Sequence, residues 1–244
     1  YADGFAPGEG LYVGGFAGVG TGLGQPKVVT NGGDGTTANG AKDSYSGEIN
    51  DGGIGLQGIE AGATMGYGYK MGDLYAGFET EFAGGDVTFK ISGDNIEISD
   101  PNGNALADKD ISAIEATKDW TTGAFGRIGY YVNPDTLFSL RGGVLVSEFT
   151  VKVTGTTSYS EDFVGGGPAV GASLESRLTA IDPNLSLRMD TVYTDYLTAS
   201  VFGIGANDPT NTADRQGHNS EVTGSALSAR IGLQYSFFDV NSLF

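Results

Sequence analysis

The stretch from residue 227 to residue 237 reads L-S-A-R-I-G-L-Q-Y-S-F, and two kinds of side chain alternate along it. Leucine, alanine, isoleucine, tyrosine and phenylalanine fall on one face, whereas serine, arginine, glycine and glutamine fall on the other. A period of two is typical of a β-strand with one apolar and one polar side. About ten residues, tilted, cross the hydrocarbon core of a bilayer, while strands of soluble proteins more often have about five or six. The stretch therefore predicts a membrane-spanning β-strand.

The same alternation recurs upstream and predicts eight strands in all, at residues 11–20, 59–70, 74–82, 120–132, 136–153, 167–178, 185–195 and 227–237. Short connections follow the second, fourth and sixth strands, and longer polar ones follow the first, third, fifth and seventh. Outer-membrane barrels alternate short periplasmic turns with long extracellular loops in this way. We therefore expect an all-β fold, an eight-stranded antiparallel up-and-down transmembrane β-barrel over residues 11–237. Residues 1–10 are expected to be a loosely held lead-in and residues 238–244 a tail, both on the periplasmic side.

The composition fits this fold and excludes several classes of protein. The chain has 244 residues, 42 of them glycine, and no cysteine, so a disulfide scaffold and thiolate metal sites are excluded. A net charge of −17 argues against a nucleic-acid partner, because phosphate binding requires clustered lysine and arginine. There is no apolar run long enough for a transmembrane helix, and any signal peptide is expected to be absent from this sequence. The mean hydropathy of −0.12 does not argue against membrane strands, because alternation averages their hydropathy to near zero.

The polarity of the two strand faces distinguishes between kinds of barrel. A lipocalin-like soluble carrier has an apolar interior and a polar outer surface. Here the polar face carries both signs of charge, which can pair inside a narrow lumen. The alternative, the solvated face of an open antiparallel sheet, does not explain why six of the seven basic residues of the predicted strands lie on the polar face. The predicted lumen charge network consists of Glu60, Lys70, Glu79, Glu81, Arg127, Arg141, Glu175, Arg177, Arg188, Asp190 and Arg230.

The opposite face of the predicted strands is apolar and aromatic, and we expect it to contact lipid. The predicted lipid-facing belt includes Met65, Tyr67, Phe78, Leu140, Val144, Leu187, Ile231 and Leu233.

Four segments carry a resemblance to a known family: residues 10–18 (GLYVGGFAG), 72–82 (GDLYAGFETEF), 119–130 (DWTTGAFGRIGY) and 230–237 (RIGLQYSF). They resemble the small eight-stranded outer-membrane proteins of Gram-negative bacteria, of the OmpA-like and alphaproteobacterial porin-like type. The resemblance covers nearly all of the chain, although only the strands carry it. It implies outer-membrane lipid, lipopolysaccharide and the outer-membrane assembly machinery as partners. The C-terminal assembly signal of such proteins falls on Arg230, Gly232, Tyr235 and Phe237, and the seven residues after Phe237 depart from the family pattern.

Catalytic and metal sites find little support in the sequence. His218 is the only histidine, and a nucleophile such as the nearby Ser220 needs a spatial arrangement that adjacency does not supply. We therefore expect no enzyme and no cofactor. Aspartate, asparagine and glycine cluster in three predicted loops, and their oxygens are ligands that Ca²⁺ accepts, although none of the clusters has the EF-hand spacing. The candidate calcium ligands are Asp34, Asp100, Asn102 and Asp208.

Eight strands leave an interior just wide enough for side chains, so the expected lumen is plugged. The predicted function is a structural or interaction protein that displays acidic extracellular loops and associates laterally with its own kind. A pore for small solutes or ions is the alternative, and a surface enzyme is the third reading.

Overall fold

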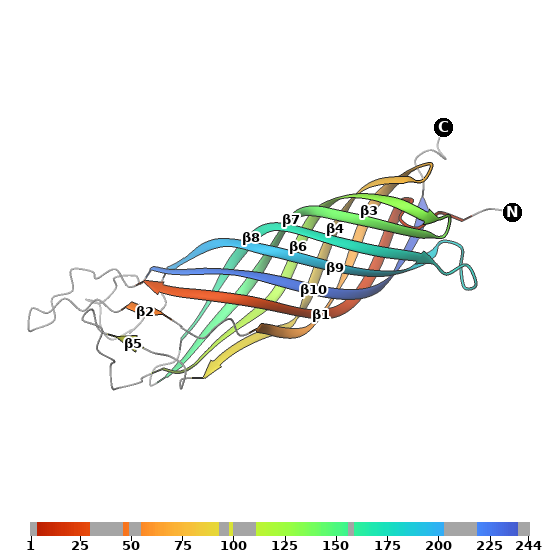
Figure 1. Ribbon diagram of the computed structural model, residues 1–244. Coiled ribbons are helices and arrows are strands. Elements are labelled where there is room, and N and C mark those ends of the chain that lie inside the picture. The colour runs from red at the N-terminus through yellow and green to blue at the C-terminus, as the bar shows by residue number, and fades with distance from the viewer. Residues whose placement is uncertain are drawn as a thin grey trace, which may run out of the picture.

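A computed structural model describes residues 4–29, 46–48, 55–92, 98–99, 111–155, 159–202 and 219–238. Within these ranges the wall of a barrel is built from eight long strands (Figure 1). They are β1 (Gly10–Val29), β3 (Gly55–Met71), β4 (Leu74–Ser92), β6 (Ile111–Asn133), β7 (Thr136–Gly155), β8 (Tyr159–Arg177), β9 (Leu185–Phe202) and β10 (Asn219–Phe238). Two short strands, β2 (Ser46–Glu48) and β5 (Ile98–Ser99), extend the pairing of β1. No helix in the described part of the chain is long and apolar enough to cross a membrane.

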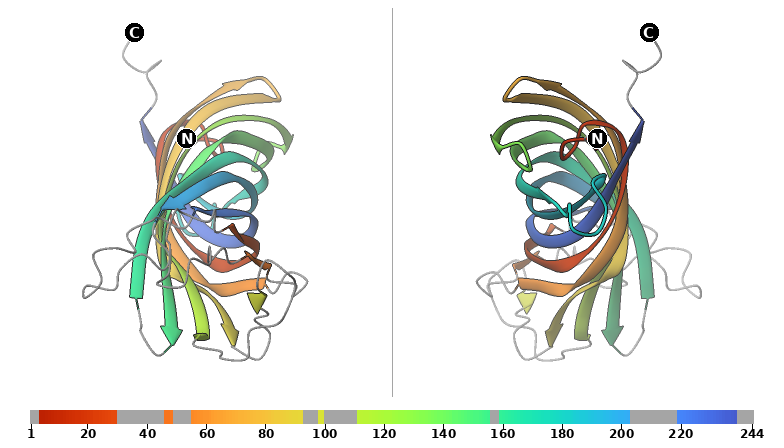
Figure 2. Two further views of the ribbon diagram at one scale, coloured as in Figure 1. Left: turned by 90° about the vertical axis from the view of Figure 1, so that its left-hand side faces the viewer. Right: turned by 90° about the vertical axis from the view of Figure 1, so that its right-hand side faces the viewer.

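The sheet closes on itself, because β1 pairs antiparallel with both β3 and β10. Each remaining pair of neighbouring wall strands is also antiparallel. The register can be followed once around the barrel, starting at Ile59 of β3, through Val19, Ala229, Thr191, Ala172, Leu140, Ile128 and Ala76. It returns to β3 at Tyr69, so the stagger is 69 − 59, or ten residues. A fixed stagger of this kind requires tilted strands, and the tilt is visible in Figures 1 and 2.

The two ends of the barrel differ. The start of β1, the end of β10 and the turns β3–β4, β6–β7 and β8–β9 all lie at one end, on the right-hand side of Figure 1. We call this the short-turn end and the opposite one the long-loop end. The connections after β1, β4 and β9 are long, as predicted, but the prediction of a long connection after the fifth strand is wrong. Only residues 156–158 separate β7 from β8, fewer than residues 178–184 between β8 and β9.

The outer wall carries an apolar belt, as the alternation predicts. On β10, Ile231 is 54% exposed while its neighbour Arg230 is 5% exposed. The eight residues predicted to face lipid all lie on this outer face; Tyr67 and Leu187 are partly exposed, and the other six are exposed. Their side chains would meet water in a soluble protein, so the belt is explained only by a hydrocarbon medium.

Beyond the belt, toward the long-loop end, the polarity of the alternation inverts. The outer face there becomes polar, with side chains such as Asp86, Thr88, Glu115, Thr117, Glu148, Thr150 and Asp162. The inner face becomes apolar, with the half-buried Phe149 and the buried Val87, Leu145 and Tyr196. This segment has the polarity of a barrel in water. The membrane boundary therefore lies where the pattern inverts.

The inversion explains why the strands are longer than expected. We predicted that the third strand ends at residue 82 and that residues 83–118 form a long polar segment, with its VTFKI and NIEI pieces as candidates to extend the strands beyond the membrane. The strands are extended there, since β4 continues to Ser92 and β6 begins at Ile111. The first, fifth, sixth, seventh and eighth strands are extended in the same direction. Outward-facing polar residues are not expected in a strand that contacts lipid, so these parts of the strands resemble loop sequence.

A lysine in the belt should destabilise the barrel in proportion to its depth. Ile231→Lys, in the middle of the belt on β10, should lower the free energy of unfolding by about 2–4 kcal/mol. Tyr235→Lys, four residues nearer the short-turn end, should lower it by clearly less, toward about 0–1 kcal/mol at the interface. Urea unfolding in liposomes, followed by the fluorescence of the single tryptophan, measures both. Equal effects at the two positions would contradict a hydrocarbon-facing belt.

The barrel lumen as the candidate functional site

The lower charge layer of the lumen, nearer the short-turn end, is centred on Arg127 of β6. Its guanidinium is fully buried and donates to Glu175 and, at 2.8 Å, to Ser139 Oγ. It also donates to Tyr12 Oη at 2.9 Å, and Tyr12 donates to Glu79 Oε2 at the same distance. Arg188 donates to Glu79, which places both carboxylates of this layer between arginines.

The upper charge layer lies toward the long-loop end. Arg230 Nε donates to Glu60 Oε1 at 2.7 Å and its Nη1 donates to Glu81 Oε1 at 2.9 Å. Arg141 donates to Glu81 and, at 3.0 Å, to Asp190 Oδ2. Arg141 Nη1 also lies 3.2 Å from Glu79 Oε1, so this arginine joins the two layers.

The described charges of the two layers balance. Arg127, Arg141, Arg188, Arg230 and Lys118 supply five positive charges, and Lys118 Nζ lies 3.1 Å from Glu60 Oε2. Glu60, Glu79, Glu81, Glu175 and Asp190 supply five negative ones. An unpaired buried charge is very costly, whereas paired and hydrogen-bonded charges are tolerated. The whole net charge of −17 therefore lies outside this lumen network.

An apolar layer covers the upper charges on the long-loop side. Phe125, Leu145, Ala169, Val192 and Tyr196 form a buried cluster, against which Phe149 packs edge to face on Tyr196. The hydroxyls of Thr121, Ser147 and Tyr196 are joined by two hydrogen bonds of 2.8 Å. This layer lies between the arginine–carboxylate pairs and the long-loop end, and Lys118, which is the register partner of Phe149, reaches Glu60 from the level of the layer.

The short-turn mouth is closed by residues 4–10, which we call the strap. Ala6 packs with Tyr75, Tyr131 and Leu137, and Pro7 is fully buried. Our prediction of a loosely held lead-in is therefore wrong for the described residues 4–10. The sequence has no periodicity there because the strap is fixed by side chains of other strands and not by its own secondary structure.

Among the described residues, the cavity that borders the charges is small. A cavity of about 10 Å³ borders Arg188, Asp190 and Gln234, which is room for about one water molecule. The lumen is thus filled by side chains, as the small strand number requires.

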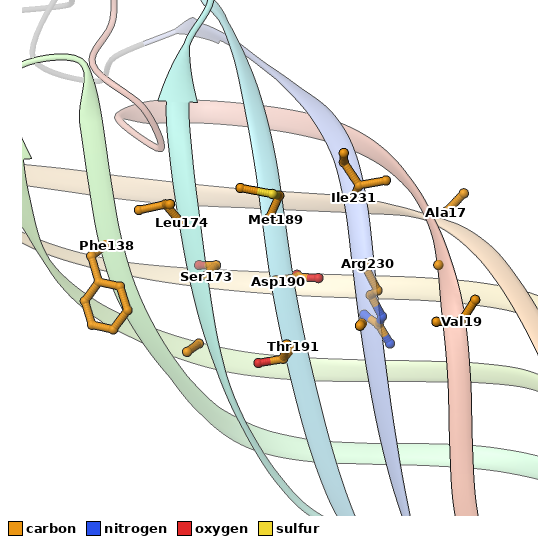
Figure 3. Close-up of a pocket in the computed structure, with 13 residues that line it drawn as sticks. Ala17, Val19, Phe138, Ser173, Leu174, Met189, Asp190, Thr191, Arg230 and Ile231 are labelled. Carbon is orange, nitrogen blue, oxygen red and sulfur yellow. The ribbon is translucent and has the colours of Figure 1, made fainter.

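The outer wall carries a shallow hollow of about 580 Å³ (Figure 3). Its floor includes three small side chains that are register partners, Ala229, Thr191 and Ala172. A row of larger side chains borders it, namely Ile231, Met189, Leu174 and Phe138. The hollow lies inside the apolar belt.

Searches against family models and against curated proteins find no match. Solved structures do match. The outer-membrane protease OmpT of Escherichia coli superposes with a TM-score of 0.52 at 11% identity, over 94% of this chain and 97% of that one. OprG of Pseudomonas aeruginosa gives 0.46 at 13% identity, over 96% and 99%, and the Neisserial surface protein NspA gives 0.40 at 14%, over 94% and 98%.

The chain has the fold of a bacterial outer-membrane β-barrel. The likeness to OmpT, at this identity, shows the fold alone. Within the belt the apolar side chains face outward and the charged ones inward, which agrees with that fold.

Nine of the eleven residues predicted for the lumen network lie in the two charge layers. The other two are corrections. Lys70 is exposed at the short-turn rim, where its Nζ lies 4.9 Å from the centroid of the Tyr131 ring. Arg177 pairs with Asp135 of the β6–β7 turn and donates to Gly4 O at 3.1 Å. Both sit on inward-facing positions, but each is at the strand end, so its long side chain reaches the rim and not the lumen.

Sequence reasoning missed four partners of the charge layers. We placed Lys118 in a loop, but it lies within β6 and reaches Glu60. Tyr12, Tyr75 and Gln234 are buried and donate to or accept from the charged groups. Tyr12, Tyr75 and Gln234 lie on inward positions of their strands, and this position was the signal that could have identified them. A register shift between Lys118 and Thr121 hides Lys118 from the alternation.

The remaining candidates are placed as follows. Arg230 points into the lumen, while Tyr235 and Phe237 lie on the outer face near the end of β10, with Gly232 between. Their role as an assembly signal stays a prediction. His218 and the candidate calcium ligands Asp34, Asp100, Asn102 and Asp208 lie outside the described residues. Within the described ranges, no group of three or more His, Asp or Glu side chains is placed to hold a metal ion.

Removing one arginine from the lower layer should cost far more than removing one from the rim. Arg127→Met leaves Glu175 and Glu79 short of a buried partner and should lower the free energy of unfolding by about 3–5 kcal/mol. Arg177→Met is the matched control, because its partner Asp135 is half exposed, and should cost about 0–1 kcal/mol. Heat-modified gel mobility and urea unfolding measure both, and similar losses would contradict the assignment of Arg127 to a dry lumen.

Proposed function

We propose that this outer-membrane barrel is a structural or interaction protein, a solid barrel that displays acidic segments at its long-loop end. The observation that carries the proposal is the balanced, side-chain-filled lumen. Five positive and five negative charges of the described residues pair with each other, and an apolar layer and the strap lie on either side of them. We infer that such an interior holds no continuous aqueous path.

We place the long-loop end outside the cell and the short-turn end in the periplasm. In outer-membrane barrels the long connections are extracellular and the short turns periplasmic. The inverted polarity supports this orientation, because the wall segment with a polar outer face extends beyond the belt only at the long-loop end of the described strands.

Conductance separates this proposal from a pore. The purified barrel in planar bilayers is expected to give no steady single-channel current across the physiological pH range, because opening would require breaking buried ion pairs. The double variant Arg230→Met with Glu81→Gln removes one ion pair from the lumen and serves as the positive control. It should conduct more than the unmodified barrel, since fewer charged groups block its lumen. A stable, ion-selective current from the unmodified barrel would refute the proposal.

We further propose that the barrel associates laterally with copies of itself in the membrane, and the hollow supports this. Small side chains in an otherwise bulky apolar surface let a neighbouring surface approach closely. The acidic long-loop segments would repel one another, so divalent cations or complementary segments have to bridge them. The tail after Phe237 is a second contact in this proposal, and residues 239–244 lie outside the described residues.

Filling the hollow should weaken lateral association. Ala172→Leu with Ala229→Leu is expected to reduce cross-linked dimers several-fold in native membranes, whereas Ala61→Leu, on the outer face of β3, leaves them unchanged. Treatment with a chelator tests the cation bridges between the acidic segments, and deletion of the tail after Phe237 tests the contact made by the tail. A monomer under every condition, the unmodified barrel included, would end the lateral part of the proposal.

A further inference from the structure

The strap makes no strand pairing before Gly10 and is nevertheless buried. Three of its main-chain groups are taken by side chains from elsewhere in the chain. Asn184 Oδ1 accepts from Phe5 N at 3.1 Å, Arg177 Nη1 donates to Gly4 O at 3.1 Å, and Tyr131 Oη donates to Pro7 O at 2.9 Å. The barrel thus binds the strap mainly through hydrogen bonds to the main chain of the strap, as peptide-binding domains bind an extended ligand.

The centre of the strap fills an apolar pocket. Ala6 and Pro7 lie over Tyr75, Tyr131 and Leu137, and the two tyrosine rings meet edge to face at 6.2 Å. These side chains come from β4, β6 and β7, so three strands form one pocket at the short-turn mouth.

The shape of the strap is specific as well. Glu9 closes a tight turn, since its N donates to Ala6 O at 3.0 Å and its carboxylate accepts from Ala6 N at 2.9 Å. Gly8 has a φ of +73°, and a Cβ there would lie 3.0 Å from Tyr75 Oη. A side chain at this position is therefore disfavoured both by the backbone and by the pocket.

Most groups that hold the strap are not part of the charge layers, and Tyr75 is the exception because its hydroxyl accepts from Arg127 at 3.4 Å. Among the described residues, the side chains of Arg177 and Asn184 bond to the strap and to Asp135 and not to either charge layer, and Tyr131 donates its hydroxyl to the strap. Arg177 is the arginine that sequence reasoning wrongly assigned to the lumen. Its position at the rim is explained by the strap.

We propose that the short-turn mouth is a peptide-binding site, which this chain fills with its own residues 4–10 and which takes a separate peptide with a small residue, proline and glycine in series when the strap is released. The tether keeps the strap at an effective concentration of about millimolar, so a free peptide competes poorly while the native strap is present. The inference does not depend on whether the lumen conducts.

The test uses the full-length chain in nanodiscs and a fluorescent peptide with the sequence of residues 5–10, FAPGEG. Gly8→Val should release the strap by a change in the strap itself, so that the residues of the mouth stay unchanged. Ala6→Asp is a second variant of this kind. Heat-modified gel mobility shows that each barrel is folded. By fluorescence polarisation, both variants are expected to bind at least about tenfold more peptide than the native chain at equal peptide concentration.

Two controls identify the site. A peptide with valine in place of the glycine that corresponds to Gly8 should not bind. Adding Tyr131→Phe to Gly8→Val should weaken binding about threefold to tenfold, because one hydrogen bond to the peptide backbone is lost. Equal binding to the native and released chains, or no binding to either released chain, would overturn the proposal.

Discussion

Charge balance inside a closed wall is the constraint on which the rest of the structure depends. Eight strands enclose a lumen with room for side chains and little else. A charge placed there has only other side chains for solvation, so each guanidinium requires carboxylates within reach of two or more of its nitrogens. Arg141 illustrates this, since it contacts Glu79, Glu81 and Asp190 from β4 and β9. The network therefore ties strands on opposite sides of the barrel, in addition to their backbone ladders.

The same constraint orders the barrel along its axis. Within the belt, charges face inward because the outer medium is hydrocarbon. Past the belt the wall lies in water, and the inward positions become apolar, as Leu145 and Phe149 of β7 show only four and eight residues beyond Arg141. At the other end the strap supplies the cover that the strands do not. The polarity of the inward and outward side chains thus changes along single, unbroken strands.

The sequence predicted the fold, the strand order and the faces of the belt well, because a period of two is read directly from residues such as Ile231 and Arg230. It predicted the extent of the strands poorly, since the inverted pattern from Asp86 onward resembles loop sequence. It also failed for Lys70, Arg177 and Lys118, whose long side chains end far from their Cα positions, so that only the three-dimensional register tells rim from lumen. The strap could not be predicted at all, because its hydrogen bonds to other strands and turns come from residues more than a hundred positions away in sequence, such as Tyr131 and Asn184.

The most direct test of a sealed lumen is thiol modification from the aqueous side. The chain has no cysteine, so single substitutions are clean reporters. Ser139→Cys and Ser147→Cys place a thiol at two fully buried inward positions of β7, in the lower charge layer and in the apolar layer. A small cationic methanethiosulfonate reagent, added to both sides of the folded barrel in liposomes, should leave both unmodified until the protein is unfolded. Rapid modification of either position in the folded state would contradict the account.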